Sequence, residues 1–505
     1  MNVADRLLSS AERLPDKPAL IFHDERLDYA ELAGRVRAAA AAFQELGCSP
    51  GDRVALLLPN TPAFVEALYG ALLAGLIAVP VNAGFTSEEI RAVLDDAGAR
   101  VVVASESLAP AVQAARSQLP ALDEVIVAGA SKAPAGTRLW KAFRGDRRAP
   151  AAAELAEDAV ALLQYTSGTT GKPKGAMLTH ANLLANQEQM AATQLKVVEQ
   201  DVVLCVLPLF HIYALNVGLA FTLSRGATVL LVERFDPRQT LEEIAEHRAS
   251  VVIGAPPMYV AWVNTPGLED LDLASVRIAV SGAAALPPHV LERFTGVFGI
   301  PIWEGYGLTE TSPVLTTAAM DEAIRPGSVG RPVPGVELRL LDEAGRPAAA
   351  GDPGEVVVRG PNVFAGYWHA PEETAAVLDD EGWFSTGDIG YLDEGALFLV
   401  DRKKDLIIVS GFNVYPREVE EVIVRHPKVA DAAIIGVPHP YTGEAVKAVV
   451  VLRDGEEATA DEIIEHARAH LARFKSPEVV DFVRELPLLP TGKVRRRDLR
   501  TTEQP

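Results

Sequence analysis

Residues 164–175 read Gln-Tyr-Thr-Ser-Gly-Thr-Thr-Gly-Lys-Pro-Lys-Gly and stand between two regular patterns. The apolar run 160–163 before them predicts a buried strand, and a helical pattern begins after them at Thr179. Three glycines in the stretch leave backbone N–H groups accessible to an anion. Hydroxyl and ammonium groups add donors, from Thr166, Ser167, Thr169, Thr170, Lys172 and Lys174. The stretch therefore predicts a loop that holds a polyphosphate.

This loop differs from the phosphate loop of kinase-like NTPases. In that motif a Gly-Lys-Ser/Thr sequence opens a helix. Here Pro173 follows Lys172 and removes a backbone N–H that such a helix would use. For the stretch by itself, a solvated turn rich in glycine and threonine is the alternative interpretation.

The composition is that of an ordinary globular protein. Of its 505 residues, 49% are hydrophobic and 23% are charged. Such a length allows roughly two to four domains with large cores. The formal net charge of −21 argues against nucleic acid as a partner, so local positive groups must meet any anionic substrate. Cys48 and Cys205 offer neither a disulfide framework nor a metal cluster.

The start of the chain is charged and amphipathic, and it lacks the apolar core of a signal peptide. The longest apolar stretch, residues 67–81, is too short to span a bilayer and is interrupted by Gly70, Gly75 and Pro80. We therefore expect a cytoplasmic protein without a transmembrane segment. Loose membrane association stays open.

The hydrophobic pattern predicts an α/β fold in the first part of the chain. Up to about residue 320, short β-branched runs alternate with helical patterns such as 29–46 and 87–97. This alternation is typical of mostly parallel sheets covered by helices on both faces, and we expect two of them. The predicted strands span residues 54–58, 77–81, 101–104, 125–127, 202–207, 228–232, 250–253 and 277–281.

The pattern changes in the second part. Short alternating runs between residues 326 and 400 predict a small, mostly antiparallel, barrel-like β unit that completes an N-terminal domain of residues 1–401. Residues 402–505 contain helical and strand patterns of their own and are long enough for a small mobile α+β domain. The charged residues 401–405 predict the linker.

Several motifs, in this order, resemble those of the adenylate-forming superfamily, and specifically its fatty-acyl-CoA synthetases. Besides residues 165–175 they are Leu-Pro-Leu-Phe-His (207–211), Ser-Gly-Ala-Ala-Ala-Leu (281–286), Tyr-Gly-Leu-Thr-Glu (306–310), Gly-Trp-Phe-Ser-Thr-Gly-Asp (382–388), Asp-Arg-Lys-Lys-Asp (401–405), Ser-Gly-Phe-Asn-Val-Tyr-Pro (410–416) and Pro-Thr-Gly-Lys (490–493). The resemblance covers essentially the whole chain. It implies an enzyme that uses ATP to convert a carboxylic acid to an acyl-AMP and then transfers the acyl group to CoA.

The resemblance also implies an ATP site with Mg²⁺ as cofactor. Attack of a carboxylate on a phosphate brings two anions together, so positive charge must be placed beforehand. Thr166 and Glu310 are the implied magnesium ligands, and Asp388 and Arg402 the implied ribose contacts. The other implied ATP-binding residues are Ser167, Gly168, Thr169, Thr170, Gly171, Lys172, Lys174 and Thr309, with Gly282, Ala283, Ala284, Glu304, Gly305, Tyr306 and Gly307 forming the adenine slot.

Lys493 is the implied catalytic lysine of the first half-reaction. Alone it looks like a surface lysine in a turn, but its flexible point charge suits a bridge between carboxylate and α-phosphate. Rotation of the small domain about Lys404 would withdraw it afterwards. The same rotation would bring in the path of the CoA pantetheine arm, which the resemblance assigns to Ser410, Gly411 and Phe412.

The acyl chain is the least determined partner. His211, Leu215 and Val314 are candidates for an acyl pocket, and His211 is either a general base or a packing residue. The sequence around residues 400–416 resembles ligases of medium- and long-chain fatty acids. Three alternatives stay open: an aryl or other hydrophobic acid as substrate, a carrier-protein thiol as acceptor, and a binding protein without turnover. The oligomeric state is also open.

Overall fold

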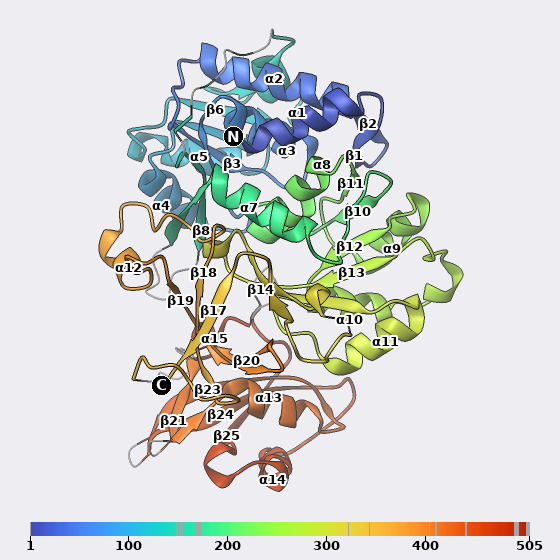
Figure 1. The fold of residues 1–505 in the computed structure, drawn as a ribbon, viewed down its shortest axis with the longest axis vertical. Coiled ribbons are helices and arrows are strands. Elements are labelled where there is room, and N and C mark those ends of the chain that lie inside the picture. Colours follow the sequence, from blue (N-terminus) through green and yellow to red (C-terminus); the bar gives the residue numbers. More distant parts are fainter. Residues whose placement is uncertain are drawn as a thin grey trace. The chain divides into compact units, whose positions relative to one another are not determined.

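The computed structural model describes residues 2–147, 150, 153, 155–156, 158–166, 173–321, 323–342, 344–402, 405–409, 412–439, 442–488 and 494–500. The chain forms two compact units (Figure 1). The larger, here called the N-terminal unit, comprises Met1–Pro326, Gly330–Glu337 and Arg359–Phe384; the C-terminal unit comprises Gly327–Val329, Leu338–Val358 and Ser385–Pro505. The domain limits expected from the sequence, 1–401 and 402–505, stay a prediction.

The first sheet of the N-terminal unit has seven strands in the order β7-β6-β5-β3-β4-β8-β9. Its strands are β3 (Arg53–Leu57), β4 (Ile77–Pro80), β5 (Val101–Ser105), β6 (Glu124–Ala128), β7 (Arg138–Leu139), β8 (Val160–Thr166) and β9 (Lys174–Thr179). Neighbouring strands run parallel except β8 and β9. The sheet is therefore mostly parallel, as predicted.

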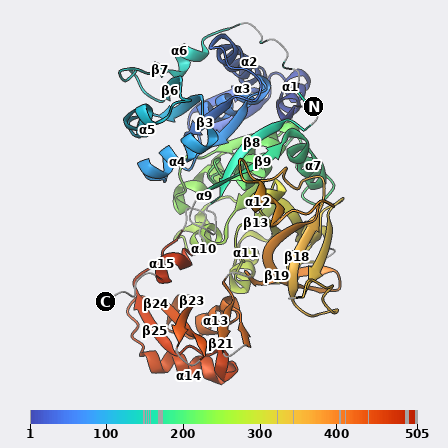
Figure 2. The same cartoon turned by 90° about the vertical axis from the view of Figure 1, so that its left-hand side faces the viewer.

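Helices cover both faces of this sheet (Figure 2). One face packs on α4 (Ser87–Ala97) and α5 (Ala109–Ala115). The opposite face lies toward α2 (Tyr29–Glu45) and α3 (Pro62–Leu73). The bounds of α4 follow from its sequence, because Thr86 caps its first turn reciprocally with Glu89 and Gly98 ends it with a left-handed φ of 58°.

The second sheet has nine strands in the order β16-β15-β14-β13-β12-β10-β11-β1-β2. They are β1 (Pro18–Phe22), β2 (Glu25–Asp28), β10 (Val202–Cys205), β11 (Thr228–Leu231), β12 (Val251–Gly254), β13 (Ile278–Ser281), β14 (Ile302–Gly307), β15 (Val314–Thr317) and β16 (Arg331–Pro332). The six central strands are parallel, and β2, β15 and β16 are antiparallel additions at the edges.

A large apolar core lies between this second sheet and three helices. The helices are α9 (Pro237–Glu246), α10 (Pro256–Val263) and α11 (Pro288–Phe298). Trp262 and Tyr259 of α10 are fully buried in it and meet edge to face at 5.4 Å between ring centroids. The two predicted sheets with helical cover are thus confirmed.

The C-terminal unit contains two smaller sheets. One has the order β17-β18-β19-β20, with β17 (Glu337–Leu341), β18 (Gly354–Arg359), β19 (Phe384–Asp393) and β20 (Ala396–Arg402). The other joins β21 (Ile407–Val409), β22 (Phe412–Val414), β23 (Val429–His439), β24 (Gly443–Leu452) and β25 (Val479–Val483). The helices of this unit that pack with the second sheet are α13 (Pro416–Val424), α14 (Ala460–His470) and α15 (Arg496–Arg500). This small α+β region agrees with the predicted fold class.

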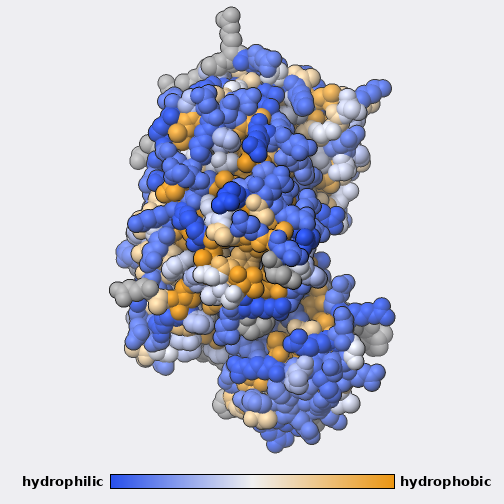
Figure 3. Space-filling view, turned by 90° about the vertical axis from the view of Figure 1, so that its right-hand side faces the viewer, coloured by the Kyte–Doolittle hydropathy of each residue, from blue (hydrophilic) through white to orange (hydrophobic). Residues whose placement is uncertain are grey.

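Hydrophilic residues make up most of the surface seen in Figure 3, with hydrophobic residues in smaller groups between them. Within the part of the chain that the structure describes, no helix combines the length and the apolar composition that crossing a bilayer requires.

The N-terminal helix α1 (Val3–Arg13) is fastened to the second half of the N-terminal unit by a histidine. His180, at the start of α7 (His180–Ala191), is only 3% exposed, and its Nδ1 accepts a hydrogen bond from Val3 N–H at 3.1 Å. Burial lowers the pKa of His180 to about 4, so the neutral ring that accepts this bond is favoured in the folded protein.

The stability of the protein should therefore fall as the pH drops from about 6.5 to about 4. The unfolded chain takes up the proton first, because its histidine has the higher pKa. The loss attributable to His180 is of order 3 kcal/mol. Between pH 7.5 and pH 5 the melting temperature should fall less for His180→Asn than for wild type, because asparagine keeps an acceptor near the position of Nδ1 and does not titrate. The control is His23→Asn, a substitution of an exposed histidine. If His180→Asn loses as much stability between pH 7.5 and pH 5 as wild type does, the assignment is contradicted.

Candidate active site

A β hairpin carries the predicted phosphate loop. Thr166 ends β8, Lys174 begins β9, and the two are direct partners in the antiparallel register. Thr179 then caps α7 through a hydrogen bond from Asn182 N–H at 3.1 Å, which confirms the predicted start of the helix. The sequence analysis missed β9. The loop itself, with Ser167, Gly168, Thr169, Thr170, Gly171 and Lys172, lies outside the described residues.

A segment far along the chain, residues 365–368, is hydrogen-bonded to β9 of the hairpin. Met177 N–H donates to Gly366 O at 2.9 Å, and Trp368 N–H donates to Gly175 O at 2.7 Å. Gly175 allows this approach, because a Cβ there would come within 3.1 Å of the Tyr165 ring and 3.4 Å of the Trp368 Cβ.

The same segment reaches the acidic motif. Glu310 lies in the 3-10 turn η4 (Thr309–Thr311) and is buried, with 8% of its surface exposed. Phe364 N–H donates to Glu310 O at 2.8 Å, and the Tyr367 hydroxyl donates to Glu310 Oε1 at 2.8 Å. The Nζ of Lys174 lies 5.3 Å from the centroid of the Tyr367 ring. The structure thus brings Glu310 and Lys174 to one tyrosine, and Thr166 lies directly opposite Lys174 in the hairpin.

Burial, together with the neighbouring Glu310 carboxylate, raises the pKa of Tyr367. Its hydroxyl is therefore protonated at neutral pH and acts as the donor to Glu310. No sequence motif pointed to this tyrosine. The signal that could have found it is its place in a Gly-Tyr-Trp run just beyond an apolar stretch, but only the tertiary contact gives it a role.

Buried amides hold the backbone that follows Glu310. Asn362, which is fully buried, donates from Nδ2 to Thr311 O at 2.8 Å and to Val314 O at 3.0 Å. From the other side, Asn216 Nδ2 donates to Ser312 O at 2.7 Å. These bonds satisfy carbonyl groups of the turn after Glu310 and of the first residue of β15, and so hold the turn in place.

The residues predicted to form the adenine slot lie at the carboxyl ends of two adjacent parallel strands. Ser281 at the end of β13 is paired with Glu304 in β14, so Gly282, Ala283 and Ala284 follow one strand while Gly305, Tyr306 and Gly307 continue the other. The buried Glu304 ties them together, accepting from Leu286 N–H at 3.1 Å. Ligands of α/β proteins commonly bind at such strand ends.

Gly307 is required by packing. A Cβ at this position would lie 1.7 Å from the carbonyl oxygen of Pro313, closer than any non-bonded contact. The strand end can therefore turn toward Thr309 and Glu310 only because residue 307 has no side chain.

The predicted ribose pair lies in the C-terminal unit. Asp388 in β19 and Arg402 in β20 are direct cross-strand partners. Asp388 is 9% exposed, and its N–H donates to Thr386 Oγ1 at 3.1 Å. The side chain of Arg402 lies outside the description, as do the predicted Lys404, Ser410, Gly411 and Lys493; for Phe412 only the backbone at the start of β22 is described.

Two of the three acyl-pocket candidates lie in or next to an unusual helix. His211 precedes the nine-residue π-helix η2 (Tyr213–Phe221), and its Nδ1 accepts from Tyr213 N–H at 3.3 Å. Leu215 in η2 and Val314 in β15 are both buried. The sequence analysis missed the π-helix, a rare form that often occurs at functional sites. The acyl-pocket role of these residues stays a prediction.

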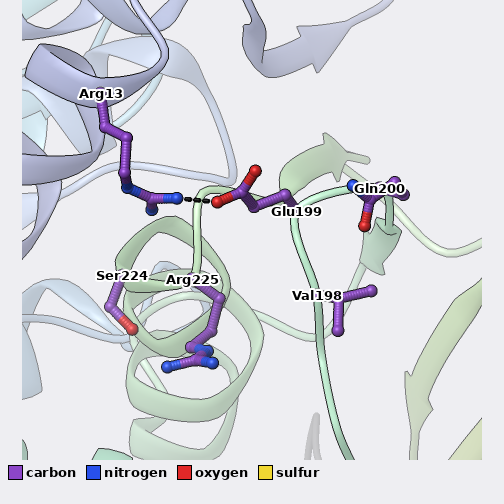
Figure 4. A pocket seen from close by; sticks show the side chains of 6 residues that line it. All are labelled: Arg13, Val198, Glu199, Gln200, Ser224 and Arg225. Atoms are coloured by element: carbon purple, nitrogen blue, oxygen red, sulfur yellow. Dashed lines mark ion pairs between the residues drawn. The ribbon is translucent and has the colours of Figure 1, made fainter.

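A separate surface pocket of about 390 Å³ lies elsewhere in the N-terminal unit. Its lining includes Arg13 and Arg225, and Figure 4 shows Arg13 paired with Glu199 at its rim. The remaining lining residues are Val198, Gln200 and Ser224. None of the predicted site residues that the structure describes lines this pocket.

Comparisons with known proteins agree with the motifs. The family model "AMP-binding enzyme" matches residues 7–368, and the model of the C-terminal domain of AMP-binding enzymes matches residues 418–493. A long-chain-fatty-acid–CoA ligase of Bacillus subtilis is 39% identical, over 98% of this chain and 93% of its own. A Mycobacterium tuberculosis CoA ligase for a methyl-dioxo-octahydroindenyl propanoate is 40% identical, over 98% and 97%.

A solved structure agrees as well. The ATP-bound MatB from Rhodopseudomonas palustris superposes with a TM-score of 0.91 at 34% identity, covering 99% of both chains. The chain belongs to the family of AMP-binding enzymes, the adenylate-forming superfamily that its ordered motifs predicted.

Proposed function

We propose that the protein is an ATP-dependent acid–CoA ligase that forms an acyl-AMP and transfers the acyl group to CoA. The observation that carries the proposal is the cluster of Glu310, Tyr367 and Lys174 beside the β8–β9 hairpin. A buried carboxylate and an ammonium held next to an anion-binding loop are what a metal–triphosphate substrate requires. The names of similar proteins support the same chemistry.

Mg²⁺ is the proposed cofactor, held by Glu310 and Thr166. The donor chemistry fits, because Mg²⁺ commonly takes one or two carboxylates and completes its shell with substrate phosphates and water. Among the described residues, no group of three or more His, Cys, Asp or Glu side chains gathers into a metal site of its own. When bound, Mg²⁺ would neutralise phosphate charge.

The chain's own residues have separate tasks in the first half-reaction. The loop residues and Lys174 bind the β- and γ-phosphates, and Asp388 and Arg402 bind the ribose. The adenine rests between the ends of β13 and β14, near Tyr306. Lys493 holds the acid's carboxylate beside the α-phosphate, so that attack by one carboxylate oxygen expels pyrophosphate.

The second half-reaction follows once pyrophosphate has left. Rotation of residues 402–505 about Lys404 withdraws Lys493 and brings Ser410, Gly411 and Phe412 to the reacting carbonyl. The CoA thiol then attacks the acyl-AMP, and AMP is the leaving group. Such a domain movement separates the two steps in time.

A medium- or long-chain fatty acid is the proposed substrate, and the cytoplasm the proposed location. The 39% identical relative is a long-chain-fatty-acid–CoA ligase, which favours this class. The 40% identical relative acts on a bicyclic propanoate and supports another hydrophobic acid as the second candidate. The buried Leu215 and Val314 suit either.

An acid series should distinguish these substrates. AMP release with ATP, Mg²⁺ and CoA should peak on straight chains of medium or long length among acids from acetate to palmitate, with benzoate and cinnamate included. Activity confined to the aryl acids would keep the mechanism and overturn the fatty-acid assignment. Acid-dependent pyrophosphate exchange without any acyl-CoA would point to a carrier protein as the acceptor.

Lys493→Ala should slow acyl-AMP formation about a hundredfold or more, because it removes a charge that acts in the transition state. Thioester formation from supplied acyl-AMP should stay near the wild-type rate, since the proposal removes Lys493 from that step. Pyrophosphate exchange and single-turnover CoA acylation measure the two steps. Lys132→Ala, an exposed lysine, is the control. Equal losses in both steps would refute the role given to Lys493.

A further inference from the structure

Tyr367 contacts two predicted ATP-site residues with different parts of its side chain. The hydroxyl donates to Glu310 Oε1 at 2.8 Å, and the ring face lies 5.3 Å from the Nζ of Lys174. The first contact is a charge-assisted hydrogen bond and the second a cation–π interaction. One rigid side chain therefore contacts both a negative and a positive group.

The position of Tyr367 is itself set by its surroundings. Its N–H donates to Thr374 Oγ1 at 2.9 Å, and its ring meets the Phe364 ring edge to face at 4.9 Å. Tyr367 also pairs with Ala176 of β9 in an isolated antiparallel bridge. Backbone and ring are both held, so the hydroxyl needs little reorganisation to meet Glu310.

The segment that carries Tyr367 also donates hydrogen bonds to the backbone around Glu310. Asn362 donates to Thr311 O and Phe364 donates to Glu310 O, both at 2.8 Å. The same segment, residues 362–367, therefore contacts both the side chain of Glu310 and the backbone of its turn. The hydrogen bonds from Asn362, Phe364 and the Tyr367 hydroxyl all end on the turn that contains Glu310, which distinguishes them from general packing contacts.

We propose that Tyr367 is the positioning residue of the metal–triphosphate site: its hydroxyl orients the Glu310 carboxylate toward the metal, and its ring holds the Lys174 ammonium toward the phosphates. This inference rests on the proposed function and deepens it. Tyr367 does not react with substrate; it acts through Glu310 and Lys174. Its two contacts are separable by substitution, because Phe keeps the ring and loses the hydroxyl.

The test compares Tyr367→Phe and Tyr367→Leu with wild type. Tyr367→Phe should raise the Mg²⁺ concentration for half-maximal AMP formation about tenfold, as expected for loss of a hydrogen bond to a charged group, while saturating Mg²⁺ restores most of kcat. Tyr367→Leu should in addition weaken ATP binding, since it also loses the cation–π contact. Binding of Mn²⁺–ATP, followed by electron paramagnetic resonance without turnover, should weaken in the same order.

A double-mutant cycle tells positioning from a general loss of stability. In a Glu310→Gln background, Tyr367→Phe should cause no further change in Mn²⁺–ATP binding, because its effect passes through the carboxylate. Tyr29→Phe is the matched control: it removes a buried hydroxyl bond to Ala227 O at 2.7 Å, outside the proposed site. It should lower the melting temperature and leave the Mg²⁺ dependence unchanged.

Wild-type Mg²⁺ dependence and Mn²⁺–ATP affinity in Tyr367→Phe would overturn the inference, and so would additive effects in the cycle. If Tyr367→Phe does not fold, Tyr367→Gln and Tyr367→Leu give the same contrast, because both lack the ring and only Gln can donate; equal metal dependence of these two would overturn it. Failure of the proposed function is distinguishable: wild type would then bind Mn²⁺–ATP without acid-dependent AMP release.

Discussion

The hydrogen bonding of the segment around Phe364 and Tyr367 is the constraint on which the candidate site depends. On one side the segment extends the β8–β9 hairpin through Met177 and Gly175; on the other it holds the Glu310 turn. The acidic turn lies beyond the end of β14, outside the regular part of the sheet. Without this shared segment, the β8–β9 hairpin and the Glu310 carboxylate, which belong to different sheets, would have no fixed spacing, and the metal–triphosphate site that we propose needs one.

The two mostly parallel sheets supply the rigid part of the arrangement. Parallel strands direct their carboxyl ends to the same edge, so the ends of β13 and β14 bring two sequence motifs together, and the hydrogen bond from Leu286 N–H to Glu304 joins them. The buried amides Asn362 and Asn216 then fix the irregular turn beyond β14, where sheet hydrogen bonds end. The amide side chains satisfy backbone groups here, as backbone hydrogen bonds do within a sheet. The turn that carries Glu310 is thereby fixed without being part of a strand.

The net negative charge of the protein explains why the few positive groups of the candidate site matter. A chain with a formal net charge of −21 repels a polyanion at long range, so affinity for ATP must come from a few cations and N–H groups at short range. Lys174 lies over the ring of Tyr367, whose hydroxyl binds the buried Glu310, and charges interact more strongly in such a partly buried place than in water.

The sequence by itself determined the fold class, most strand positions, the helical pattern that begins at Thr179 and the family, because apolar runs, helical patterns and ordered motifs are local in the chain. It also named Glu310, Lys174 and the adenine-side residues as one site. Only the tertiary structure decided that β9 intervenes before α7, that residues 213–221 form a π-helix, and that Tyr367 links Glu310 to Lys174. β9 pairs with the nearby β8 and also with residues 365–368, and Tyr367 joins segments far apart in sequence, so a local pattern alone does not record these contacts.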